Sequence, residues 1–136
     1  AVVQYCEDSP KQFYIDSSYR LTMSSQSNAT PTEPIHLTDA NEYAEIVSRY
    51  DTVLVDFYAD WCGPCQMMEP TIEALAEDTA AAILKVDVDQ FQGLASQHGV
   101  QGIPTLLIYA AGEQAERMVG AQTGDALENT VTGYTS

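Results

Sequence analysis

Apolar residues in this chain gather into short, nearly continuous runs separated by polar stretches. The clearest run, Val53-Leu54-Val55, continues through Phe57 and contains few polar positions. A continuous apolar run is typical of a strand that is covered on both faces, as in a parallel sheet. We expect strands at Ile35 to Leu37, Thr52 to Tyr58, Ala82 to Val88, Leu106 to Tyr109 and Arg117 to Gly120. The last two form an antiparallel hairpin, because Ala111-Gly112 between them is a turn signal.

Between these runs, apolar residues recur at the three- to four-residue spacing of amphipathic helices. One helix is predicted to begin at Asp39, whose side chain caps it, with Glu42 three residues on in a capping-box arrangement. A second runs from Phe91 to His98 and ends at Gly99, and a third runs from Asp125 to Tyr134. The inward-facing residues of the first and third are Tyr43, Ile46, Val47, Tyr50, Leu127 and Val131.

The longest predicted helix runs from about Cys62 to Asp78. Pro70 lies in its interior and cannot donate a backbone hydrogen bond, so we expect a kink there. Met67, Ile72, Leu75 and Ala76 are predicted to face inward, whereas Glu69, Glu73 and Glu77 follow an outer face exposed to solvent. The alternation of strands and helices, ending in a hairpin and a helix, predicts an α/β domain with a mixed sheet.

Residues 1–34 differ in composition from the rest. Ser24 to Pro34 is rich in Ser, Thr and Pro and contains little that a core would bury, which favours a disordered extension. Met23 is followed by small, polar residues, as an initiator methionine often is, so residues 1–22 are expected to be an extension or the product of an upstream start. We therefore expect one folded domain, residues 35–136.

Acidic residues outnumber basic ones by twenty to five, giving a formal net charge of -15. Binding to nucleic acid is disfavoured, since the phosphate backbone would be repelled. An acidic surface also keeps a protein soluble. The scarcity of lysine and the many small alanines favour a sharper interpretation, adaptation to molar salt, in which self-repulsion is screened over about 3 Å. No apolar run approaches the ~18 residues of a membrane span, and we expect a cytoplasmic protein.

Two cysteines, Cys62 and Cys65, stand two residues apart at the turn between a strand and a helix. The first amides of a helix are unpaired and its N-terminus is positive, so a thiolate there is stabilised. Cys-x-x-Cys motifs lower thiol pKa values in this way and create the nucleophilic form. The pattern predicts a redox pair, with Cys6 left over. A zinc site would need four ligands, and neither His36 nor His98 is spaced as a partner for the thiols.

At these residues the chain resembles the thioredoxin family. Trp61-Cys62-Gly63-Pro64-Cys65 is that family's active-site sequence, and Asp56, Pro70, Ile103-Pro104-Thr105, Gly112 and Val119-Gly120 match at the expected distances. The resemblance runs from about Ile35 to Tyr134. It implies the thioredoxin fold, a central mixed sheet of five strands flanked by four helices, and reduction of disulfides in client proteins.

The resemblance also implies roles for individual residues. Cys62 attacks the client disulfide, Cys65 resolves the mixed disulfide, and Asp56 exchanges a proton with the Cys65 thiol. Pro104 matches the family's cis-proline, although sequence cannot distinguish it from a trans turn proline. A shallow apolar groove for peptide segments is expected from Trp61, Ile103, Pro104, Val119 and Gly120.

Asp56 is placed in the middle of an apolar strand, where a carboxylate is costly unless it is protonated or paired. Burial should raise its pKa and suit it to proton transfer, although a satisfied core aspartate is the plainer interpretation. Bacterial members of the family that this chain resembles often place a lysine near this acid, at the position taken here by Ile83. Lys85 lies on the same side of its strand as Ile83, so two hypotheses remain: Lys85 pairs with Asp56, or it points to solvent.

These features predict a monomeric protein that reduces client disulfides and is itself reduced again by a thioredoxin reductase. Its redox centre is the Cys62-Cys65 disulfide, with no further cofactor and no metal. An oxidase or isomerase on the same fold is the first alternative, and Gly63-Pro64 between the cysteines argues for the reducing direction. A binding module that uses the groove, with redox chemistry secondary, is the second alternative.

Overall fold

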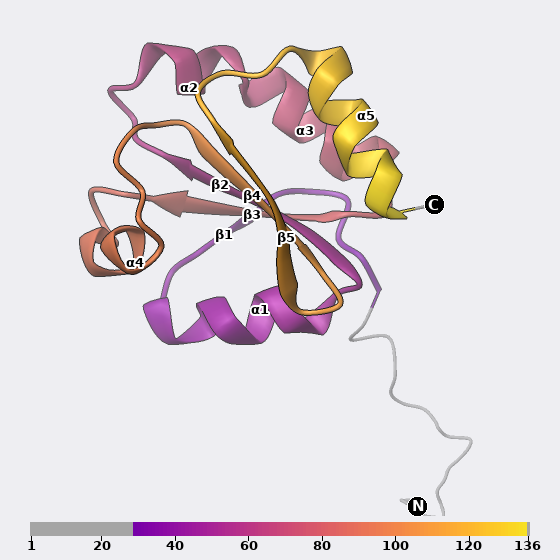
Figure 1. Ribbon diagram of the computed structural model, residues 1–136, viewed down its shortest axis with the longest axis horizontal. Helices are drawn as coiled ribbons and strands as arrows, with labels where there is room; N and C mark the ends of the chain where they lie inside the picture. The colour runs from indigo at the N-terminus through magenta and orange to yellow at the C-terminus, as the bar shows by residue number, and fades with distance from the viewer. Residues whose placement is uncertain (1–28, 136) are drawn as a thin grey trace, which may run out of the picture.

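The computed structural model of the chain describes residues 29–135. The predicted extension, residues 1–34, therefore lies mostly outside the described residues, as does Cys6. Residues 29–34, the part of it that is described, contain no helix or strand. From Ile35 onward the chain forms five strands interleaved with helices, ending in a helix at the C-terminus (Figure 1).

The five strands form one mixed sheet in the order β1-β3-β2-β4-β5. Both β1 and β2 run parallel to β3, whereas β4 runs antiparallel to β2 and to β5. The strands are β1 (Ile35–His36), β2 (Thr52–Tyr58), β3 (Ala82–Asp87), β4 (Thr105–Ala110) and β5 (Glu113–Val119). This is the five-stranded mixed sheet that the sequence and its resemblance led us to expect.

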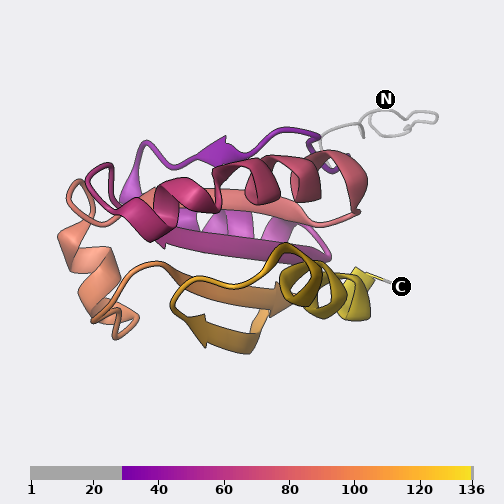
Figure 2. The ribbon, with the colours of Figure 1, turned by 90° about the horizontal axis from the view of Figure 1, so that it is seen from above.

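Helices cover both faces of the sheet, which explains the continuous apolar runs of the central strands. On one face, Val53, Val55 and Phe57 of β2 pack against α1 (Tyr43–Arg49) and α4 (Gln92–Gln97). On the other, Leu54 packs with α3 (Glu69–Asp78) and α5 (Gly124–Thr135). Figures 1 and 2 show these two layers, with α4 and the start of α2 (Gly63–Met67) at the same end of the sheet.

The long predicted helix is broken into α2 and α3 at Met68, two residues before Pro70. The kink expected from the proline is thus confirmed. The prediction that Met67 faces inward is wrong: Met67 is 81% exposed, and Met68 is buried with Ile72 and Leu75. Met68 lies four residues before Ile72, on the same helical face, whereas a residue five positions before Ile72 falls outside that stripe.

The remaining boundaries shift by a few residues. The side chain of Asp39 accepts a hydrogen bond from the Asn41 amide at 2.9 Å, confirming the cap, but a 3-10 turn, η2 (Ala40–Glu42), precedes α1. Strand β5 begins four residues before the predicted Arg117. With α2 and α3 counted as one kinked helix, four helices flank the sheet, as expected. Within residues 29–135, no helix has both the length and the apolarity to span a bilayer.

Candidate active site

The two cysteines of the motif are joined by a disulfide at the start of α2. Cys62 is the N-cap of this helix, and its Sγ accepts a hydrogen bond from the Cys65 amide at 3.2 Å. Cys65 lies in the first turn, after Gly63 and Pro64. The sulfur of Cys62 therefore faces the unpaired amides of a helix N-terminus, which stabilise negative charge. When the disulfide opens, Cys62 is the sulfur placed to remain as a thiolate.

Both sulfur-bearing side chains are buried in this oxidised form. Cys62 is 4% exposed and Cys65 is 2% exposed. Ala59 packs with the pair, and Tyr58, Val88 and Ile103 border it. Trp61, directly before the disulfide, is by contrast 69% exposed. A partner that reaches Cys62 must therefore approach over the indole and the neighbouring loops.

Three segments far apart in the sequence meet beside the disulfide. The Ile103-Pro104 peptide bond is cis, as expected from the resemblance, and the Ile103 carbonyl oxygen lies 3.9 Å from Cys62 Sγ. The Gly120 amide donates to the Pro104 carbonyl at 2.7 Å, which joins the end of β5 to this loop. Val119 is 62% exposed next to it. The structure thus brings the predicted groove residues Ile103, Pro104, Val119 and Gly120 together near Cys62.

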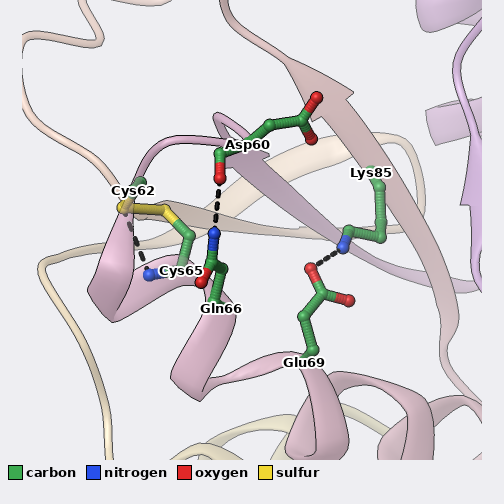
Figure 3. Close-up of polar contacts among 6 residues, drawn as sticks. All are labelled: Asp60, Cys62, Cys65, Gln66, Glu69 and Lys85. Carbon is green, nitrogen blue, oxygen red and sulfur yellow. Dashed lines mark hydrogen bonds and ion pairs between the residues drawn. A yellow bond between two sulfur atoms is a disulfide. The ribbon is translucent and has the colours of Figure 1, made fainter.

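Two hydrogen bonds at the motif were missed by the sequence reasoning. Trp61 Nε1 donates to Asp89 Oδ2 at 2.8 Å, which fixes the exposed indole against the loop after β3. Gln66 Nε2 donates to the Asp60 carbonyl oxygen at 2.5 Å, which ties α2 to the loop before Trp61 (Figure 3). The partners are 28 and 6 residues apart. Only the second lies close enough in sequence for a local pattern to suggest it.

Asp56 lies within β2 with 2% of its surface exposed. Loss of solvent raises the pKa of its carboxyl from the ordinary 3.8 to about 6, Lys85 lowers it in part, and Glu69 raises it again. The expected rise is therefore confirmed, and a carboxyl with a pKa near neutral is suited to proton transfer at physiological pH.

Lys85, and not residue 83, is the position opposite Asp56. In the parallel pairing of β2 with β3, Asp56 is the register partner of Lys85 and Leu54 that of Ile83. A lysine at position 83 would therefore not lie opposite Asp56, whereas Lys85 does. Lys85 is 3% exposed, which excludes the hypothesis that it points to solvent. Its charge lowers the pKa of Asp56.

The direct partner of Lys85 is Glu69, at the start of α3. Lys85 Nζ forms an ion pair with Glu69 Oε2 (Figure 3) and lies 4.3 Å from the centre of the Tyr58 ring. The prediction that Glu69 belongs to a purely solvated face is wrong: its side chain is 36% exposed and bound to a buried ammonium. Glu73 and Glu77 are exposed as predicted.

Of the two histidines, His36 lies in β1 opposite Lys85, and the ring of His98 packs 4.7 Å from that of Tyr43. Among residues 29–135, no group of three or more His, Cys, Asp or Glu side chains is arranged to hold a metal ion.

The thioredoxin family model matches residues 33–133 of the chain. The chain is 38% identical over 102 residues to a thioredoxin from Porphyra purpurea, covering 74% of this chain and 95% of that protein. It is 48% identical over 86 residues to one from Chlorobaculum thiosulfatiphilum, covering 62% and 80%. Among solved structures, a point mutant of thioredoxin from Halobacterium salinarum NRC-1 has a TM-score of 0.76 at 53% identity, covering 79% and 96%. Oxidised mitochondrial thioredoxin 3 from Saccharomyces cerevisiae has a TM-score of 0.68 at 31% identity, covering 74% and 94%.

Proposed function

The chain belongs to the thioredoxin family and is a thiol-disulfide oxidoreductase that reduces protein disulfides, and we propose the following roles for its residues. Cys62 is the attacking sulfur and Cys65 the resolving one. The observation that carries this assignment is the position of Cys62 as the N-cap of α2, with the Cys65 amide directed at its sulfur. A thiolate at Cys62 is stabilised there by the helix N-terminus, whereas Cys65 lies inside the first turn.

The reaction transfers two electrons from the cysteine pair to the client. The Cys62 thiolate attacks one sulfur of the client disulfide, that bond breaks, and the other client sulfur leaves and takes up a proton. Cys65, after losing its proton, attacks Cys62 in the mixed disulfide. The client's second sulfur leaves and takes up a proton, and the Cys62-Cys65 disulfide forms. The client ends as a dithiol, and the pair ends in the oxidised state found in the structure.

Asp56 is proposed to accept the proton of the Cys65 thiol in the second step. It is a buried carboxyl on the strand that leads into the motif, and its pKa of about 6 lets it be ionised near neutral pH yet still bind a proton. A base works best when its pKa lies near the working pH. The same residue returns the proton to Cys65 when a reductase reduces the disulfide.

The client is proposed to lie across Trp61, Ile103, Pro104, Val119 and Gly120. Trp61 and Val119 supply exposed apolar surface, and the Ile103 carbonyl beside Cys62 Sγ is available to an extended peptide. The partners proposed are disulfide-containing client proteins and a thioredoxin reductase. The disulfide is the only redox centre required, and the protein is proposed to work as a cytoplasmic monomer.

Adaptation to high salt is the further element of the proposed function. Its support is the net charge of -15, together with 53% identity to a thioredoxin from Halobacterium salinarum. Repulsion among exposed carboxylates is screened at molar salt, so the folded chain should need salt for full stability.

Two cysteine variants test the roles, assayed by reduction of insulin disulfides at low and at molar salt. Cys62→Ser should abolish reduction, since no sulfur is left to attack. Cys65→Ser should instead accumulate a mixed disulfide with the client, visible by mass spectrometry, because attack survives and release does not. Cys6→Ser keeps the pair and serves as the control. Normal turnover by the Cys65→Ser protein would refute the assignment of roles.

A further inference from the structure

One cation lies among several carboxylates on the side of the sheet that carries Asp56. Lys85 and Glu69 line a groove of about 380 Å³ between α3 and the segment around β1. The groove is also lined by Thr32, Glu33, Pro34, His36, Glu73 and Glu77. Lys85 is the only lysine in residues 29–135. The charge of this single ammonium is therefore the one that the surrounding acids share.

Two carboxylates on different elements compete for Lys85. Asp56 is opposite Lys85 in the β2–β3 register and is buried with it, at 2% and 3% exposure. Glu69 comes from α3 and forms the ion pair with Lys85 Nζ, while its own side chain remains 36% exposed. Tyr58, whose ring lies against the ammonium, and His36, the register partner of Lys85 in β1, are further titratable neighbours. The long side chain of Lys85 thus extends from the position opposite Asp56 in the sheet toward α3, where Glu69 binds its ammonium. Figure 3 shows Lys85 and Glu69 pointing toward one another.

We propose that Glu69 is a positioning residue for disulfide exchange: by binding the Lys85 ammonium at the groove, it prevents that cation from neutralising Asp56 fully, so that Asp56 can hold a proton near neutral pH. A free ammonium beside a buried carboxylate would strongly favour the ionised form. Glu69 weakens this effect, because it shares the same positive charge and adds a negative one. The pKa of Asp56 responds accordingly: burial raises it, Lys85 lowers it and Glu69 raises it.

This inference rests on the proposed role of Asp56 as proton acceptor for Cys65. If Glu69 did not hold Lys85, Asp56 would be a weaker base, and proton transfer from the Cys65 thiol would be slower at neutral pH. Glu69 touches neither the sulfurs nor the client in this scheme and acts only through Lys85 and Asp56.

The direct test is an NMR titration of the Asp56 carboxyl in the oxidised protein of residues 1–136, where the paired cysteines do not titrate. The resonance is assigned by its absence in Asp56→Asn. Glu69→Gln keeps the shape of the side chain and removes its charge, and the Asp56 midpoint should fall by about one pH unit.

Glu73→Gln, one turn along α3, removes the same charge from a residue that does not pair with Lys85 among the described residues. It should move the midpoint by less than a third as much. An Asp56 curve in Glu69→Gln that overlays the parent curve, or that matches Glu73→Gln, would overturn the proposal.

A double variant separates positioning of Lys85 from the direct effect of Glu69's charge. Lys85→Met should raise the Asp56 midpoint, and adding Glu69→Gln to it should then shift the midpoint by less than half of the shift in the parent. An equal shift in both backgrounds would show that Glu69 does not act through Lys85, and would overturn the inference.

Kinetics then separate this inference from the proposed function itself. The rate at which Cys65 releases the client from the mixed disulfide should fall at acid pH, and this fall should move to lower pH in Glu69→Gln. If the Asp56→Asn protein released the client from its mixed disulfide with Cys62 at the parent rate, the proposed role of Asp56 as proton acceptor would be refuted. The titration results for Glu69 would still stand. If Asp56→Asn slowed release but the Glu69→Gln titration did not move, only the role of Glu69 would fail.

Discussion

Replacing Asp56 by Asn should make the protein more stable, and by an amount that depends on pH. The carboxyl has a pKa of about 6 in the folded chain against an ordinary value of 3.8, so the folded state binds this proton more tightly than the unfolded state does. Folding is therefore favoured where the group is protonated and penalised where it is ionised. The penalty is complete above the folded pKa and is relieved as the pH falls through about 6 towards 3.8.

The size of the penalty follows from the shift. A rise of about two pH units corresponds to about 3 kcal/mol at 1.36 kcal/mol per unit. Because Asp56 is only 2% exposed, solvent screening reduces this free-energy penalty only slightly. At pH 5 the folded carboxyl is mostly protonated, and the same linkage leaves about half of the penalty. A buried Asn amide has its own desolvation cost, but that cost does not change with pH. The change with pH is thus the cleaner quantity.

Urea denaturation of oxidised parent and Asp56→Asn proteins between pH 5 and pH 8, at constant ionic strength, measures this difference. The stability gained by the variant should be larger at pH 8 than at pH 5 by about 1–2 kcal/mol. The range stops at pH 5 because the pI is about 4.1. Asp60→Asn, which removes a charge from an exposed position, controls for the change in net charge. A difference between Asp56→Asn and parent that is constant across the range would refute the raised pKa.

Two other predictions follow from the charge and from the backbone. The melting temperature should rise between about 0.1 M and 1 M monovalent salt, because the Debye length falls from ~10 to ~3 Å. Neutralising Glu73, Glu77 and Asp78 together should flatten that rise. A parent melting temperature that is flat or falling would contradict salt adaptation. Gly120→Ala should lower the urea-denaturation stability by about 1–3 kcal/mol, since Gly120 has φ +92 although no atom lies within 4 Å of an added Cβ. Gly133→Ala, within the last turn of α5 and with equally open space, should instead stabilise by up to about 0.5–1 kcal/mol. Equal effects of the two changes would contradict the strain at Gly120.

The strands and the redox motif could be predicted because their signals are local. Burial on both faces requires a continuous apolar run, so Thr52–Tyr58 was identified to the residue. The break between α2 and α3 followed from the missing amide of Pro70. The error at Met67 was one of phase, since Met68, and not Met67, continues the stripe of Ile72 and Leu75.

The charges around Asp56 could be predicted only in part, because they depend on contacts between elements. Strand parity correctly placed Lys85 on the face of Asp56, but parity does not give the register, which shows that Lys85 is directly opposite Asp56. The Lys85–Glu69 pair joins a strand to a helix across 16 residues of sequence. Glu69, Glu73 and Glu77 are alike as a pattern, and the buried cation that distinguishes Glu69 becomes visible only when β3 and α3 are packed together.

The acidic residues of this chain act in two environments: exposed carboxylates repel one another through solvent, whereas Asp56 acts on the buried Lys85. Most carboxylates in residues 29–135 are exposed, and their repulsion acts through solvent, where salt screens it. Asp56 and Lys85 are almost fully buried, and a buried pair is screened much less. Glu69 is the link between the two environments, because it is partly exposed yet bound to the buried ammonium. Salt should therefore change the stability of the fold more than the proton affinity of Asp56, so that one active site can serve over a wide range of salt concentration.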